Sequence, residues 1–195
     1  MRSKTLSLFI LASLFAVSAH AATYTVDADH TSVSFKIKHL FSKLQGRFNK
    51  FEGTIDYEPG KPESWKTAGS IEVTSIDTNE PKRDKHLLSA DFFDAEKNPT
   101  IEFKSTGVKD TSGNSARLEG VLKMHGIEKP VVLDVDINGV GKDPWGNTRA
   151  AFTATTKINR KDFGMNWNQA LDNGGILVGE EVEITLEIEA IEKTA

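Results

Sequence analysis

The sequence predicts a mostly antiparallel, all-β fold of about eight strands with one or two short helices. Three observations lead to this prediction. Runs of residues alternate between apolar and polar side chains, which is the period of a strand with one dry and one solvated face. Turn-forming groups rich in Gly, Asn, Asp and Pro separate these runs. Only two short segments lack the alternation, so helices are expected only there.

Eight runs of the sequence show this alternation. In residues 32–39, Val33, Phe35 and Ile37 share one face and polar residues occupy the other. The run that begins at Val182 is the clearest, because apolar residues alternate there with Glu and Thr. The runs expected as strands are 32–39, 53–57, 71–73, 101–103, 118–124, 131–137, 150–158 and 182–190.

Two segments interrupt the pattern. Residues 40–44 form a short apolar step that is compatible with one helical turn. Residues 79–89 lack alternation and predict a short helix with Pro81 near its start. Asn138-Gly139 is among the pairs that predict a turn. The apolar strand faces can be covered by two packed sheets or by a closed barrel, and the pattern alone does not choose between them.

Length and composition exclude several classes of protein. The 195 residues are 38% hydrophobic and 27% charged, which excludes a disordered chain, a collagen-like repeat and a multi-spanning membrane protein. The formal net charge of −4 argues against nucleic acid as a partner, because phosphate binding needs a concentrated positive face. The chain has no cysteine, so disulfides, thiolate metal ligands and cysteine nucleophiles are excluded together.

Residues 1–21 have the anatomy of a cleavable signal peptide. Arg2 and Lys4 precede an apolar stretch from Leu6 to Val17, and residues 19–21 (Ala-His-Ala) form a cleavage site after Ala21. The stretch is shorter than the roughly 20 apolar residues that a spanning helix needs, and no later segment predicts a stable membrane anchor. The sequence therefore predicts export to the periplasm, followed by one domain over residues 22–195.

The densest polar segment, residues 77–86, contains the residues that an enzyme would need. Arg83, Asp84 and His86 could act as an acid, an orienting group and a base. On a helix, however, Arg83 and His86 share a face while Asp84 points elsewhere, and no nucleophile motif accompanies them. A structural role in holding a helix and a loop is the favoured interpretation, so no catalytic residue is predicted.

The histidines and the phenylalanines indicate which ligands the protein could bind. The histidines outside residues 1–21 are not at ligand spacing from one another, so no metal site is predicted. His39 shares the parity of an apolar face, so it is either a core histidine or a polar group at a cavity mouth. The chain has 11 Phe and 2 Tyr, a choice of apolar rings that suits both an ordinary core and an apolar tunnel.

Stretches along nearly the whole chain carry a family resemblance. The most specific is residues 83–93, Arg-Asp-Lys-His-Leu-Leu-Ser-Ala-Asp-Phe-Phe, preceded by Ser75-Ile76-Asp77-Thr78. The other matching stretches are 27–35, 38–40, 46–48, 51–53, 99–105, 120–122, 126–132, 143–146 and 161–164. Together they resemble the YceI family of periplasmic proteins, which bind polyisoprenoid lipids.

The resemblance implies an extended, eight-stranded, lipocalin-like antiparallel barrel. Such a barrel would hold a long isoprenoid, a polyprenyl lipid or an isoprenoid quinone, in its lumen without a cofactor and without catalysis. Family members often form homodimers, and the sequence does not reveal whether this chain does.

Strand parity divides the expected ligand-binding residues into three groups. The tunnel lining is expected to be Phe35, Ile37, Phe48, Phe51, Ile55, Phe103, Leu118, Leu122, Phe152, Ile184 and Leu186. The mouth or lid is expected to be Leu40, Phe41, Leu87, Leu88, Phe92 and Phe93, with His39, Arg83, Asp84 and His86 as the polar groups near a head group. Arg160, Lys161 and Asp162 could also lie at the rim of the barrel, and a solvated turn is the favoured interpretation of them.

The sequence is compatible with three functions. The first is a periplasmic carrier of an isoprenoid lipid. The second is the same barrel with a fatty acid or fatty amide as cargo, since an apolar tunnel discriminates poorly by chemistry. The third is an enzyme that acts on a lipid head group through Arg83, Asp84 and His86.

Overall fold

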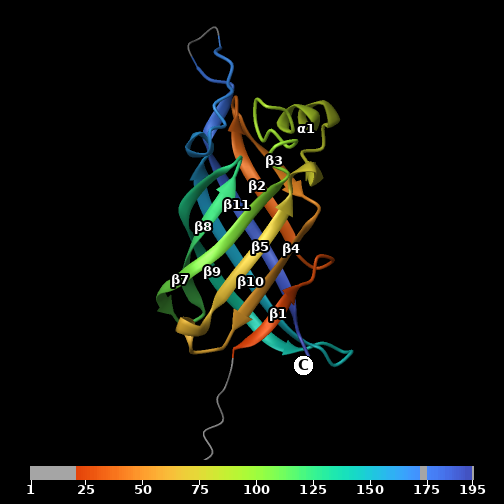
Figure 1. Ribbon diagram of the computed structural model, residues 1–195, viewed down its shortest axis with the longest axis vertical. Helices are drawn as coiled ribbons and strands as arrows, with labels where there is room; N and C mark the ends of the chain where they lie inside the picture. The colour runs from red at the N-terminus through yellow and green to blue at the C-terminus, as the bar shows by residue number, and fades with distance from the viewer. Residues whose placement is uncertain (1–20, 172–174, 195) are drawn as a thin grey trace, which may run out of the picture.

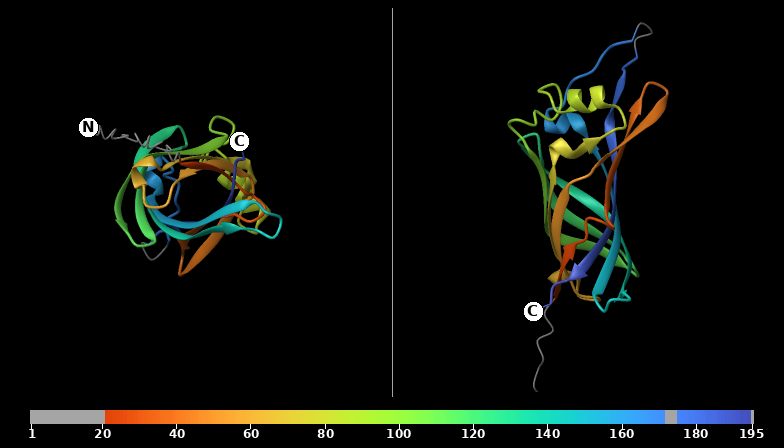
Figure 2. Two further views of the ribbon diagram at one scale, coloured as in Figure 1. Left: turned by 90° about the horizontal axis from the view of Figure 1, so that it is seen from below. Right: turned by 90° about the vertical axis from the view of Figure 1, so that its right-hand side faces the viewer.

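An antiparallel sheet closes on itself around a central lumen (Figures 1 and 2). The computed structural model describes residues 21–171 and 175–194. Its strands are β1 (Ala22–Val26), β2 (Ser32–His39), β3 (Ser42–Phe48), β4 (Phe51–Tyr57), β5 (Lys66–Glu72), β6 (Ile76–Asp77), β7 (Thr100–Ser112), β8 (Ser115–Met124), β9 (Ile127–Lys142), β10 (Thr148–Asn159) and β11 (Val178–Glu192). Its helices are α1 (Pro81–Leu87) and the short 3-10 turns η1 (Pro62–Ser64), η2 (Val73–Ser75) and η3 (Arg160–Phe163).

These strands follow eight paths, because three paths are broken in the middle. β1 and β2 both pair with β11, on successive parts of its length, so they form one path interrupted at residues 27–31. β3 and β4 form the second path, broken at residues 49–50, and η2 interrupts the third between β5 and β6. β7 to β11 complete the meander, and the pairing of β11 with β1 and β2 closes it. The barrel predicted from the resemblance is therefore confirmed, and the two-sheet alternative is not observed.

One helix covers one end of the barrel. α1 lies across the upper end in Figure 1, and η3 lies at the same end in Figure 2, right; we call this the capped end. The predicted helix over residues 79–89 is confirmed as α1, with Pro81 in its first turn. The opposite end, which we call the far end, carries the turn between β9 and β10 and the C-terminal end of β11 (Figure 1).

Two local predictions are wrong. Residues 40–44 form a tight turn and the start of β3 instead of a helical turn, with Leu40 at a φ of 52°. Asn138-Gly139 lies inside β9, where the register with β10 shifts between Ala151 and Phe152. An extra residue is accommodated there as a bulge, so the strand continues to Lys142.

The interior is packed in three groups of buried residues. One, near the capped end, includes Phe48, Val73, Ile76, Phe163 and Met165. Another, near the far end, includes Tyr24, Ile55, Tyr57 and Phe152, and a smaller one joins Leu118, Leu133 and Ala154. Most of these residues face the lumen because strand side chains alternate between the two faces of the wall.

The predicted signal peptide falls almost entirely outside the residues that the structure describes. The predicted signal peptide, residues 1–21, lies outside the described residues except for Ala21. Among the residues that the structure describes, no helix is long and apolar enough to cross a membrane.

Candidate functional site

The barrel encloses an apolar cavity of about 580 Å³. Each of the eight strand paths contributes side chains to its wall, from Val26 on β1 to Ile188 on β11. This volume lies within the range of about 300–1,000 Å³ that is usual for pockets that bury most of a ligand's surface. An eight-stranded barrel is wide enough for its own side chains and one slim ligand, so the cavity is the candidate site.

Cross-strand register explains why the wall is apolar. Phe35 pairs with Ile184, and Ile37 with Val182, so each pair presents two apolar side chains to the lumen. The residues between them point outward and are polar, as the period of two predicts. The binary pattern of the sequence thus becomes an apolar inner surface and a charged outer one.

Aromatic rings line the wall toward the capped end. The ring centroids of Phe35 and Phe48 are 5.8 Å apart, and Phe93 meets Phe48 edge-on at 6.0 Å. These distances are typical of favourable aromatic pairs. The rings give the lumen a smooth apolar lining without hydrogen-bonding groups.

The far end of the cavity is lined by Tyr57, Trp65 and Phe152. The Tyr57 ring lies 4.9 Å from Trp65 and 5.2 Å from Phe152, measured between centroids. The Trp65 indole Nε1–H donates to the Glu58 carbonyl at 2.8 Å. Burial raises the pKa of the Tyr57 phenol above its ordinary value.

The polar residues of segment 77–86 hydrogen-bond to one another at the capped end. The Thr78 hydroxyl donates to Asp84 Oδ1 at 2.5 Å and accepts from Arg83 Nε at 2.7 Å. Arg83 Nη2 also donates to the Thr78 carbonyl at 2.7 Å, and the Glu80 carboxylate caps α1 by accepting from the backbone N–H of Arg83 at 2.8 Å. Arg83 and Asp84 are therefore engaged in holding α1 against residue 78, which favours the structural interpretation of this segment.

His86 also has structural contacts. Its imidazole packs edge-on against Phe92 and Trp167, with ring centroids 5.1 Å and 4.9 Å away. Its Nε2 lies 2.8 Å from Asp91 Oδ2. His86, Phe92 and Trp167 all line the cavity, so this aromatic cluster forms part of its wall at the capped end.

Arg160 is the one charged residue of the described chain that is almost completely buried, with 2% of its surface exposed. It lies in η3 and forms part of the cavity wall. Its Nε donates to the Gly179 carbonyl at 2.8 Å, and its Nη1 donates to the Met165 carbonyl. Burial lowers the pKa of its guanidinium. The interpretation of Arg160 as part of a solvated turn is wrong, because η3 folds the side chain inward.

Most of the expected ligand-binding residues line the cavity. They are Phe35, Ile37, His39, Phe48, Phe51, Ile55, Arg83, His86, Leu87, Phe92, Phe93, Phe103, Leu118, Leu122, Phe152, Ile184 and Leu186. Their contact with a ligand remains a prediction.

Four expected residues lie away from the wall. Leu40 and Phe41 form the tip of the turn between β2 and β3, and Phe41 is 91% exposed. The Asp84 carboxylate binds Thr78, and Leu88 packs against the buried core near the capped end. Their sequence positions are next to wall residues, but the turn and the helix direct their side chains elsewhere.

Sequence reasoning missed Trp65 and Trp167 as wall residues, and for Arg160 it favoured a solvated turn over a place at the rim. Trp65 and Trp167 lie in connections that show no alternation, so strand parity does not apply to them. Arg160 follows the end of β10 directly. A signal for it exists, because Ile158 two residues earlier faces inward and the parity of the strand extends one more step.

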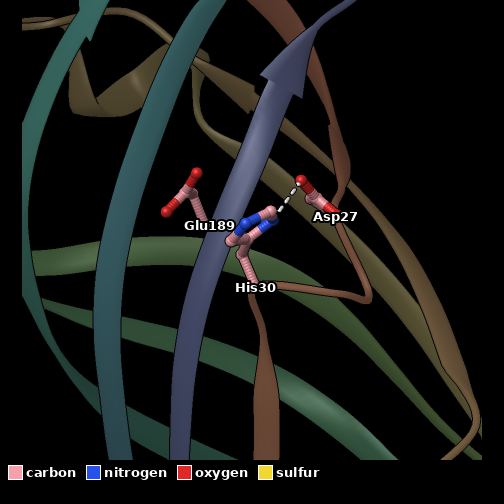
Figure 3. Close-up of side chains that lie close together, drawn as sticks. All are labelled: Asp27, His30 and Glu189. Carbon is pink, nitrogen blue, oxygen red and sulfur yellow. Dashed lines mark hydrogen bonds and ion pairs between the residues drawn. The ribbon is translucent and has the colours of Figure 1, made fainter. Parts of the chain in front are cut away.

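Asp27, His30 and Glu189 bring three potential metal-ligating groups together on the outside of the barrel (Figure 3). His30 Nδ1 lies 2.8 Å from Asp27 Oδ2. Arg149 Nη1 donates to Asp27 Oδ2 at 2.7 Å and also to Glu189. Arg149 therefore supplies the positive charge to this acidic group, and the hydrogen bond from Arg149 lowers the pKa of Asp27.

Comparisons with known proteins agree with this architecture. A family model described as the YceI-like domain matches residues 24–190. A UPF0312 protein of Vibrio cholerae serotype O1 is 38% identical over 195 residues, which cover 97% of this chain and 99% of that protein.

Two solved structures share the fold. The crystal structure of Burkholderia cenocepacia BcnA matches with a TM-score of 0.75 at 24% identity, covering 85% of this chain and 99% of that one. A polyisoprenoid binding domain from Saccharophagus degradans matches with a TM-score of 0.66 at 12% identity, covering 89% of this chain and 100% of that one. At these identities the similarity is one of fold.

Proposed function

This chain belongs to the YceI-like domain family, and from that premise we propose that it is a periplasmic carrier of a long isoprenoid lipid. The isoprenoid, a polyprenyl lipid or an isoprenoid quinone, would lie in the lumen of the barrel. The protein would bind and release it without changing it chemically.

The cavity is the observation that carries this proposal. It is long, apolar and lined from the Tyr57 end to the Trp167 end by the inner faces of the strands. Each CH2 group moved from water into such a lining gains about 0.8 kcal/mol. A dozen such groups therefore gain about 10 kcal/mol before the cost of ordering the chain, which is enough for stable binding without a reaction.

The choice of an isoprenoid is supported by a neighbour of the same fold. The Saccharophagus degradans domain is a polyisoprenoid binding domain, and its whole length matches this barrel. A fatty acid or a fatty amide is the second candidate, because it would fill the same apolar lumen equally well.

The absence of catalysis is supported by the contacts at the capped end. Arg83 and Asp84 are bound to Thr78, and His86 lies between Asp91 and two aromatic rings. These contacts account for the conformation of the segment without a reaction. Export to the periplasm is supported by the sequence of residues 1–21, and a mature N-terminus at Ala22 is the expected result of its cleavage.

The experiment that tests the proposal is the identification of the bound lipid. The protein is purified without detergent from the periplasm of its native cells, and its organic extract is analysed by mass spectrometry. We expect one isoprenoid per protein chain. A fatty acid or amide at the same ratio would keep the carrier but change its cargo, and an extract without lipid would contradict the proposal.

A further inference from the structure

One nitrogen of the Arg160 guanidinium has no hydrogen-bond partner in the described part of the chain. Nη2 is buried and finds no acceptor among the residues that the structure describes. It is the one buried side-chain nitrogen or oxygen in that part of the chain with this property. Leaving a buried polar group unpaired is costly, and more so when the group is charged. Such a group in a binding cavity points to an acceptor that arrives with the ligand.

The two hydrogen-bond partners that Arg160 does have do not balance its charge. Nε and Nη1 donate to the carbonyls of Gly179 and Met165, which are neutral groups. Glu180 acts on Arg160 from a distance, but its carboxylate is paired with Lys161 Nζ at 2.5 Å. The buried cation therefore favours an acceptor that carries negative charge.

The segment that carries Arg160 is held firmly in place. Asn159 Oδ1 accepts from the backbone N–H of Lys161 at 2.9 Å and so caps η3. His125 Nδ1 lies 2.8 Å from the carbonyl oxygen of Phe163, which ties the other end of η3 to the turn between β8 and β9. Because η3 is fixed at both ends, Arg160 has a defined position at the cavity wall, and a small movement of the side chains that cover Nη2 would admit an acceptor.

The neighbouring cations are not equivalent to Arg160. Arg83 also lines the cavity, but its Nε and Nη2 are already bound to Thr78. Lys82 also lines the cavity, but it is exposed to solvent. Among the described residues at the capped end, Arg160 is thus the cation that is both buried and short of an acceptor.

We propose that Arg160 anchors the head group of the ligand, and that it selects a head group with an anionic oxygen, a carboxylate or a phosphate, over a neutral one. The head group would lie at the capped end, beside Met165 and Trp167, and the apolar chain would run toward Tyr57 and Trp65. This inference rests on the proposed lipid-carrier function and gives the lipid its polarity and orientation.

Matched lipids test the inference in the wild-type protein. Calorimetric titration compares dodecanoate with methyl dodecanoate, and farnesyl phosphate with farnesol. A hydrogen bond from a buried charged group predicts about ten- to a hundredfold tighter binding of the anionic member of each pair. The fatty-acid pair and the isoprenoid pair together distinguish the two sources of the head group. Equal affinity within both pairs would overturn the anchor and leave the carrier intact, whereas no binding of any of the four lipids would contradict the carrier itself.

Variants assign the preference to Arg160. Arg160→Met should abolish the difference in affinity between the members of each pair. Lys123→Met, which removes the same charge at an exposed position of β8 outside the cavity wall, should keep the difference. A preference retained in Arg160→Met would overturn the inference. If that variant does not fold, Arg160→Lys, which keeps a cation but loses the geometry of the guanidinium, should reduce the preference.

Tryptophan quenching tests the orientation independently of Arg160 variants. In a Trp65→Phe, Trp145→Phe protein, Trp167 is the remaining fluorophore, and it lies at the capped end. Bromine quenches indole fluorescence at short range. We expect 2-bromododecanoate, with bromine beside the head group, to quench Trp167 more strongly than 12-bromododecanoate. The reverse order would place the head group at the far end and overturn the inference.

Discussion

The ring of Phe35 lies against the backbone of Gly46, its register partner on the neighbouring strand. A Cβ atom on Gly46 would come within 2.4 Å of the ring's Cζ, much closer than two carbon atoms in contact can approach. A Cβ atom on Gly120 would likewise come within 2.4 Å of the Phe103 ring. Each glycine therefore lets an aromatic ring lie flat on the wall instead of standing in the lumen.

Gly46→Ala should lower both stability and lipid binding. The added methyl group must displace the Phe35 ring toward the cavity, and overpacking of this kind typically costs about 1–3 kcal/mol in the free energy of unfolding. Urea unfolding of the lipid-free protein measures the first effect, and native mass spectrometry of the lipid-loaded protein measures the second. Gly141→Ala is the matched control, because a Cβ there meets no atom within 4 Å.

The double variant Phe35→Leu, Gly46→Ala tests the cause of this effect. If the ring is what the new methyl group displaces, the double variant should be more stable than the sum of the two single changes predicts. Additive effects of the two substitutions would mean that Gly46 is required for another reason.

Ala154→Leu should block the lumen without unfolding the barrel. Ala154 faces inward in one buried group with Leu118 and Leu133 and lines the cavity. A larger side chain there reduces the volume of the lumen, so we expect less bound lipid per chain, together with a cost of about 1–3 kcal/mol in the free energy of unfolding from overpacking. Ala151→Leu makes the same substitution on the outward face of β10 and should leave the lipid content unchanged. Full lipid loading of Ala154→Leu would contradict the assignment of the lumen as the binding site.

Arg149 should make the stability of the protein sensitive to acid. Its guanidinium joins Asp27, Asp143 and Glu189, and its hydrogen bond lowers the pKa of Asp27 below the ordinary value. The hydrogen bonds from Asn147 and Arg149 lower the pKa of Asp143 as well. A carboxylate whose pKa is lower in the folded state stabilises the fold above its unfolded pKa of about 4, and this contribution is lost as the pH falls through the folded value.

The measurement is the Tm of the wild type and of Arg149→Met between pH 7 and pH 2. The variant should be less stable at pH 7. The difference in Tm should shrink as the pH falls from about 4 toward the lowered pKa values of Asp27 and Asp143, because the unfolded chain takes up protons there before the folded wild type does. Arg117→Met, which removes an exposed partner of Asp110 and Asp134, should change the Tm little at any pH. A difference for Arg149→Met that stays constant with pH would show that the ion pairs are not its cause.

The strands were the predictable part of the fold, because their pattern depends on side chains that alternate between lumen and solvent. β3 escaped prediction since its inward positions are Leu44, Gly46 and Phe48, and a glycine interrupts the apolar alternation. The turn before it escaped as well, because Leu40 adopts a φ of 52° in a place where Asn or Gly is the usual signal. Conversely, Asn138-Gly139 is a residue pair typical of turns, but here it forms a bulge within β9.

The site was predictable where it is made of strands and unpredictable where connections contribute. Parity alone identified lining residues such as Ile184 and Phe152. The positions of Trp65, Trp167 and Arg160 depend on how loops fold back over the ends of the barrel, which is a long-range property of the chain. A charged residue after a strand ordinarily faces water, and only the packing of η3 beneath the capped end turns Arg160 inward.

His86→Ala distinguishes a carrier from an enzyme that acts on the lipid head group. In the carrier, His86 holds the capped end by packing against Phe92 and Trp167, so its removal should lower the Tm and speed up the exchange of bound lipid. Lys85→Ala, at the exposed neighbouring position on α1, should change neither quantity. Both proteins are incubated with the native lipid extract, and the lipids are followed over time by mass spectrometry. A conversion of the lipid that the wild type performs and a fully folded His86→Ala loses would contradict the carrier, because a residue that only packs cannot determine whether a bond is broken.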